Sequence, residues 1–123
     1  MSLIPALVLG ATTLGVAVPP PDVAVGIAAY DRGDFTTAFA ILKPIVYDVP
    51  GDWFDPQYAW AAAYLAQMFK RGEGTAPDWP LSCALFNNVL AYQRLRGPGS
   101  ADTAIPFVSD GSKKSVCRNI RKK

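Results

Sequence analysis

The apolar residues of this chain recur at intervals of three and four, and a glycine follows close behind each such run. Residues 56–71 show the pattern most clearly, because aromatic, aliphatic and alanine residues share one side of them. This periodicity predicts an amphipathic helix. Lys70 and Arg71 suit the carboxyl end of a helix, and Gly72 can take the left-handed conformation that ends one. We therefore predict a helix from Pro56 to Arg71.

Three further segments follow the same rule. Asp22 comes after a proline run, and we expect it to cap a first helix that ends at Gly33. Asp34 is placed to cap a second helix, in which Pro44 should cause a kink or a looser last turn. Pro80 opens a fourth helix that ends at the turn RGPG. No stretch alternates with period two for long enough to predict a sheet, so the expected class is all-α.

Two corners of the chain resemble each other. Residues 30–33 (YDRG) and 69–72 (FKRG) each contain an aromatic residue, two polar residues and a glycine, at an offset of 39 residues. A period of this length is typical of helical solenoids, whose units bury their faces by stacking. We predict two α/α helical hairpins in a repeat domain over residues 22–97, followed by an irregular C-terminal extension over residues 98–123.

Residues 64–86, YLAQMFKRGEGTAPDWPLSCALF, are similar to the Sel-one-like repeat, an α/α repeat related to tetratricopeptide repeats. The positions that carry the resemblance are Ala61, Leu65, Ala66, Met68, Phe69, Gly72, Gly74, Thr75 and Asp78. Ala84 takes the place of an alanine that packs against the preceding helix, and residues 26–45 resemble the hairpin that often precedes such repeats in exported bacterial proteins. The resemblance covers residues 24–93. It implies a tetratricopeptide-like solenoid with a concave surface for protein–protein contact and no catalytic residues.

The corner from Gly72 to Gly74 also suggests a phosphate-binding loop. Such a loop follows a strand, whereas this corner follows a helix, and Glu73 would repel phosphate. Glycine is favoured wherever the backbone must take a positive φ. We therefore predict a structural hinge made by Gly33, Gly72, Gly74 and Asp78.

An enzyme is not expected. The chain contains no histidine, which is the commonest general base and metal ligand. Two distant cysteines do not supply a zinc cluster. Asp52, Asp55 and Glu73 are candidates for paired carboxylates, but they lie at corners, where acidic residues cap helices or are solvated. We expect no catalytic residue, no metal and no cofactor.

Residues 2–21 contain no charged side chain. They resemble a secretory signal peptide, with a candidate cleavage site at residues 15–17. Two alternatives remain open. Residues 1–17 could be retained as a membrane anchor, although about 25 Å of helix is short for a bilayer, or the segment could be a structural or artificial start. Export to the periplasm or out of the cell is the preferred prediction.

Export would expose the two cysteines to an oxidising compartment. A disulfide between Cys83 and Cys117 would close a loop of about 35 residues and contribute about 2–4 kcal/mol of stability. The alternative is that Cys83 is a small buried residue and Cys117 a free thiol.

The charges are distributed unevenly. Residues 1–112 contain six basic and ten acidic side chains, a net charge of −4, whereas residues 113–123 contain six basic and no acidic side chains. The simplest interpretation is a solvated basic terminus. An acidic partner or an anionic lipid would also fit, but nucleic acid is disfavoured because no aromatic residue lies between the charges.

The predicted function is a non-enzymatic protein–protein interaction module, an adaptor or scaffold of a cell envelope. Tyr30, Trp53, Phe54 and Tyr64 are candidate partner-binding residues in a groove between the first and third helices. The alternative is a secreted effector or small inhibitor that binds an acidic partner through the basic tail. In both cases the partner is another protein, and a membrane is involved only if residues 1–17 persist as an anchor.

Overall fold

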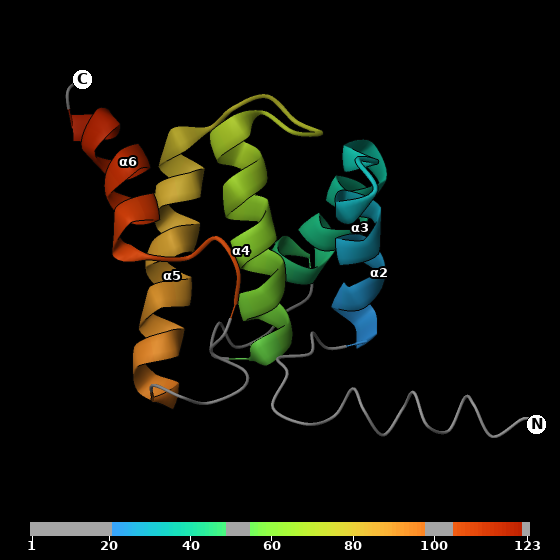
Figure 1. Ribbon diagram of the computed structural model, residues 1–123, viewed down its shortest axis with the longest axis horizontal. Helices are drawn as coiled ribbons and strands as arrows, with labels where there is room; N and C mark the ends of the chain where they lie inside the picture. Colours follow the sequence, from blue (N-terminus) through green and yellow to red (C-terminus); the bar gives the residue numbers. More distant parts are fainter. Residues whose placement is uncertain (1–20, 49–54, 98–104, 122–123) are drawn as a thin grey trace, which may run out of the picture.

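The computed structural model describes residues 21–48, 55–97 and 105–121, whose regular secondary structure is entirely α-helical (Figure 1). The predicted all-α class is therefore confirmed for them. The helices are α2 (Pro21–Asp31), α3 (Phe35–Tyr47), α4 (Pro56–Arg71), α5 (Trp79–Arg96) and α6 (Asp110–Arg121).

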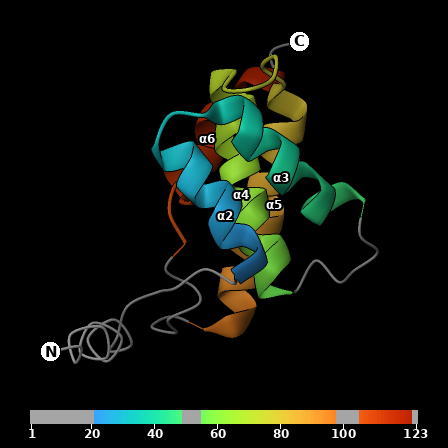
Figure 2. The ribbon, with the colours of Figure 1, turned by 90° about the vertical axis from the view of Figure 1, so that its right-hand side faces the viewer.

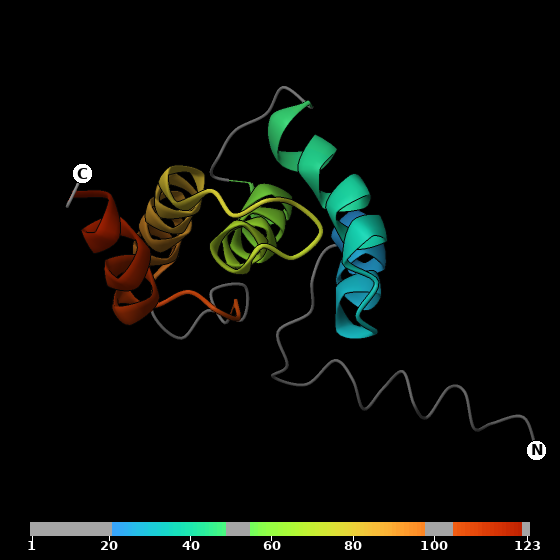
Figure 3. The ribbon, with the colours of Figure 1, turned by 90° about the horizontal axis from the view of Figure 1, so that it is seen from above.

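Helices that follow one another in the sequence also pack against one another. Seen from above, α6, α5 and α4 form a row, and the α2–α3 pair lies on the other side of α4 (Figure 3). A view onto that pair shows it in front of α4 (Figure 2). The central position of α4 explains its composition. Ten of its sixteen residues are buried, and its alanines let neighbours on several sides approach closely.

Aspartate side chains cap three of the helices, at Asp34 and Asp55 as predicted and also at Asp78, which was predicted only as a hinge residue. Asp34, Asp55 and Asp78 each accept a hydrogen bond from a backbone N–H two or three residues later, at 3.3, 2.8 and 3.1 Å. Such caps satisfy amide groups that have no partner inside the helix. The predicted cap at Asp22 was wrong, because α2 already begins at Pro21 and Asp22 lies in its first turn.

The contact between α4 and α5 differs from the prediction. Ala84 was expected to pack against the preceding helix, but it is exposed. Ser82 is the small residue that is fully buried there, and its hydroxyl donates a hydrogen bond to the carbonyl oxygen of Ala66 at 2.8 Å. The hydroxyl can be buried at low cost because this bond satisfies it.

The C-terminal region was predicted to be irregular, which is wrong for residues 110–121. They form α6, which packs against α5. Ser109 caps this helix by accepting a hydrogen bond from the backbone N–H of Ser112 at 3.0 Å. Ile105 and Val116 are buried in the same apolar core as the two hairpins. The extension therefore shares the core of the repeat region.

None of the helices in the described ranges is both long and apolar enough to cross a lipid bilayer. The predicted signal or anchor segment lies almost entirely in residues 1–20, outside the described residues.

Candidate functional site

Two of the four candidate partner-binding residues come together between α2 and α4. The rings of Tyr30 and Tyr64 meet edge to face, with centroids 5.3 Å apart. Tyr64 is only 6% exposed, and Tyr30 is half-buried. Trp53 and Phe54 lie outside the described residues.

A third aromatic ring, which sequence reasoning missed, fills the space beside them. Phe107 precedes α6, and its ring centroid lies 5.9 Å from that of Tyr30 and 5.0 Å from that of Tyr64. Its φ is 72°, a backbone conformation that residues other than glycine adopt at a cost of about 1–2 kcal/mol. Phe35, at 5.0 Å from Tyr30, completes what we call the aromatic cluster. The chain thus places its own side chain where a partner was predicted.

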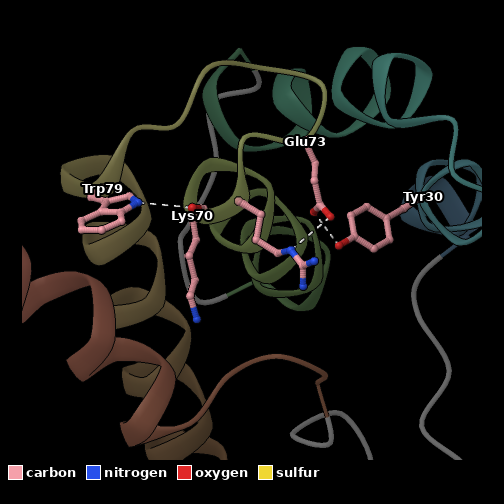
Figure 4. A network of polar contacts seen from close by, with 5 residues as sticks. Tyr30, Lys70, Glu73 and Trp79 are labelled. Carbon is pink, nitrogen blue, oxygen red and sulfur yellow. Dashed lines mark hydrogen bonds and ion pairs between the residues drawn. The ribbon is translucent and has the colours of Figure 1, made fainter.

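Hydrogen bonds tie the rim of the aromatic cluster to the corner after α4 (Figure 4). The Tyr30 hydroxyl donates to Oε1 of Glu73 at 2.7 Å, and Nε of Arg71 lies 3.4 Å from the other carboxylate oxygen. Burial and then the bond to Glu73 raise the pKa of Tyr30 above its ordinary value. At the other side of the corner, Nε1 of Trp79 donates to the carbonyl oxygen of Lys70 at 3.2 Å.

The predicted hinge glycines all have positive φ. The values are 84° at Gly33, 71° at Gly72 and 76° at Gly74. A Cβ atom at Gly74 would lie 2.5 Å from the carbonyl oxygen of Phe35. The corner therefore packs directly on the backbone at the start of α3, and it joins one hairpin to the other.

The carboxylates considered for catalysis have structural contacts. Asp55 caps α4, and Glu73 accepts a hydrogen bond from the Tyr30 hydroxyl and forms an ion pair with Arg71. Asp52 lies outside the described residues. The Glu73 side chain is 14% exposed, so most of its surface is covered by the protein.

A cavity of about 340 Å³ lies on α6. We call it the basic cavity, and the described residues that line it are Lys113, Lys114, Cys117 and Arg118. Their spacing of one, four and five places them on one side of a helix. Within the described part of the chain, none of the three cationic side chains forms an ion pair.

The acidic residue at the start of α6 is engaged elsewhere. Asp110 lies 3.8 Å from Arg94 of α5, and both side chains are mostly exposed. An exposed pair of this kind stabilises a protein by at most about 1 kcal/mol. It nevertheless orients Asp110 toward α5.

One wall of the basic cavity is covalently fixed. Cys83 of α5 and Cys117 of α6 lie at disulfide distance, with Cα atoms 5.1 Å apart, and form the predicted bond. Neither cysteine is a free thiol in this structure. The bond holds α6 against α5, and with it the position of the three cations.

No family model matches the chain, and neither the curated proteins nor the solved structures contain a match to it. The resemblance to the Sel-one-like repeat therefore stays a prediction that the residues alone support.

Proposed function

We propose that this protein is an exported interaction module that binds an acidic segment of another protein in the basic cavity. The observation that carries the proposal is the set of three cations around one cavity. Lys113, Lys114 and Arg118 lie close together, and no carboxylate is among the lining residues that the structure describes. Like charges at such spacing repel one another, and a bound anion relieves that repulsion.

The groove between α2 and α4 supports partner binding less well. Phe107 already packs against both tyrosines, Tyr64 is almost completely buried, and the hydroxyl of Tyr30 is bonded to Glu73. A partner in this groove would first have to displace Phe107. The adaptor function is therefore better supported at α6 than at the predicted anchors.

The chemistry of the cavity favours a short acidic peptide segment over a nucleic acid or a membrane. Among the described residues, its lining includes no aromatic ring on which a base could stack. The rest of the chain is acidic, with a net charge of −4 over residues 1–112. A large polyanion would have to approach that acidic body, whereas a short peptide reaches the cations without doing so.

Export and the repeat architecture are further parts of the proposal. A disulfide that contributes to the core is suited to an oxidising compartment. The α2–α3 and α4–α5 pairs supply the two hairpins of a tetratricopeptide-like repeat, in which the similar corners at Gly33 and Gly72 occupy equivalent positions.

The test compares two variants that change the net charge equally. One is K113Q/K114Q/R118Q in the basic cavity, and the matched control is R32Q/K43Q/K70Q, at positions directly after α2, on α3 and on α4. The probe is fluorescein-labelled decaglutamate, and its affinity is measured by anisotropy at low and moderate salt, together with the melting temperature of each variant.

We expect the cavity variant to lose roughly tenfold in affinity, because three exposed charge pairs contribute about 0.5 kcal/mol each. The control should lose less than about twofold through the long-range field alone. Equal losses in the two variants, or no loss in the cavity variant while its fold is intact, would contradict the proposal.

A further inference from the structure

The disulfide is part of the basic cavity, which gives this bond a chemical environment of its own. Cys117 lines the cavity together with three cations and is itself partly exposed. Thiol–disulfide exchange begins when a thiolate anion approaches a disulfide sulfur. Cations beside that sulfur raise the local concentration of anions, and so of thiolates.

The other half of the bond has a different neighbour. Asn87 lies one turn after Cys83 on α5, and its Nδ2 donates a hydrogen bond to Sγ of Cys83 at 3.7 Å. A hydrogen bond to sulfur favours the charged thiolate over the neutral thiol. A more stable thiolate leaves faster in exchange. The environment therefore assigns different roles to the two sulfurs, with attack at Cys117 and departure at Cys83.

We propose that Cys117 is a modification site at which a small anionic thiol forms a mixed disulfide. The thiolate sulfur of the small molecule attacks Sγ of Cys117 and forms a new S–S bond. The bond between Cys117 and Cys83 breaks, and its electron pair leaves on Cys83 as a thiolate that Asn87 stabilises. One thiolate is consumed and one is released, so the step needs no oxidant and no proton.

The reaction is reversible in place. The Cys83 thiolate can attack Sγ of Cys117 again and expel the small thiol, which restores the bond between α5 and α6. A carboxylate or sulfonate on the small molecule would meanwhile be held by Lys113, Lys114 and Arg118. The adduct would occupy the cavity that the proposed function assigns to an acidic peptide, so the inference shares its cations with that function but not its partner.

The test uses two thiols with the same carbon skeleton and different charge, 2-mercaptoethanesulfonate and 2-mercaptoethanol. Each is incubated with the intact, oxidised protein in low salt, and the reaction is quenched with acid and then alkylated. Mass spectrometry of peptides gives the rate and the position of the adduct, and each rate is divided by the concentration of thiolate. The cavity variant K113Q/K114Q/R118Q is measured in parallel.

We expect the sulfonate thiol to react roughly tenfold faster per thiolate, with the adduct on Cys117 and the alkyl group on Cys83. The cavity variant should react at the same rate with both thiols. Equal rates in the unmodified protein, or an adduct mainly on Cys83, would overturn the inference.

A second pair of variants tests the leaving group. Asn87→Ala should slow exchange with both thiols, whereas Asn88→Ala, whose amide instead donates to the hydroxyl of Tyr58, should leave the rate unchanged. Equal rates in the two variants would also count against the assignment. These readouts are independent of peptide binding, so a protein that binds decaglutamate in the cavity but shows no thiol preference would keep the proposed function and lose this inference.

Discussion

The aromatic cluster and the basic cavity differ in how far their side chains find interaction partners within the described part of the chain. In the aromatic cluster, Phe107 packs against Tyr30 and Tyr64, and Glu73 accepts a hydrogen bond from the Tyr30 hydroxyl. In the basic cavity, three cations face one space and form no ion pair among the described residues. The aromatic residues hold the molecule together, and the unpaired cations are the reason why we propose an anionic partner for the basic cavity.

The largest expected effect is a loss of stability in Gly74→Ala, at the corner that is hydrogen-bonded to the aromatic cluster. Its Cβ atom would collide with the carbonyl oxygen of Phe35, and alanine is strained at a φ of 76°. Overpacking and strain together predict a loss of about 4 kcal/mol in the free energy of unfolding, measured with urea.

Gly33→Ala is the matched control for that substitution. Gly33 has a similar φ of 84° but no atom within 4 Å of an added Cβ. It should lose only the strain contribution, about 1 kcal/mol. If the two variants lose equal stability, the corner at Gly74 does not join the hairpins as described.

Removal of the disulfide has the second-largest expected effect, and it should change both the stability of the fold and binding in the basic cavity. C83S/C117S should lose about 3 kcal/mol of stability. Because the bond holds α6 on α5, the variant should also bind decaglutamate more weakly at a temperature where it is still folded. Unchanged affinity in the folded variant would show that the cavity does not depend on the bond.

Phe107→Ala ranks third and separates cohesion from binding. Loss of a half-buried ring should cost about 2 kcal/mol, less than for a fully buried phenylalanine. Its affinity for decaglutamate should not change. Phe107→Gly should be at least as stable as Phe107→Ala, because glycine relieves the strain at a φ of 72°. A gain in peptide affinity in either variant would indicate that the peptide binds in the groove between α2 and α4.

The smallest effect concerns pH. Burial, with a contribution from the nearby Asp31, raises the pKa of Tyr64 from 10.0 to about 12. The folded state therefore disfavours the phenolate. The stability that the neutral hydroxyl provides is complete below pH 10 and is lost between pH 10 and about 12. Urea unfolding of the unmodified protein and of Tyr64→Phe should diverge over that interval, with the variant losing less stability. Parallel curves would place the Tyr64 hydroxyl in solvent.

The sequence predicted those parts of the fold that local interactions determine. The bounds of α4 follow from a capping aspartate and a proline at one end and from Lys70, Arg71 and Gly72 at the other. The hinge glycines also follow from local backbone requirements. These signals lie within a few residues of the feature that they determine, and so they can be recognised in one sequence.

Apart from the disulfide, features that depend on distant contacts were not predicted. The burial of Ser82 instead of Ala84 depends on the carbonyl of Ala66 on the facing helix. The position of Phe107 depends on rings of α2 and α4 far back in the chain. α6 was not predicted because its sequence is rich in charged residues and Val116 alone gives little apolar periodicity. Ser109 could nevertheless have been recognised as a helix cap. The sequence predicted only two components of the basic cavity, which are the basic tail and the disulfide that connects it to α5.

The most direct test of the central claim maps a ligand onto both regions at once. Decaglutamate is titrated into ¹⁵N-labelled protein, and the backbone amide chemical shifts are followed by NMR. The account predicts that the changes cluster at Lys113, Lys114, Cys117 and Arg118 and are reduced by salt, while Tyr30, Tyr64 and Glu73 stay unchanged. Changes that cluster at Tyr30, Tyr64 and Glu73 while α6 remains unaffected would contradict it.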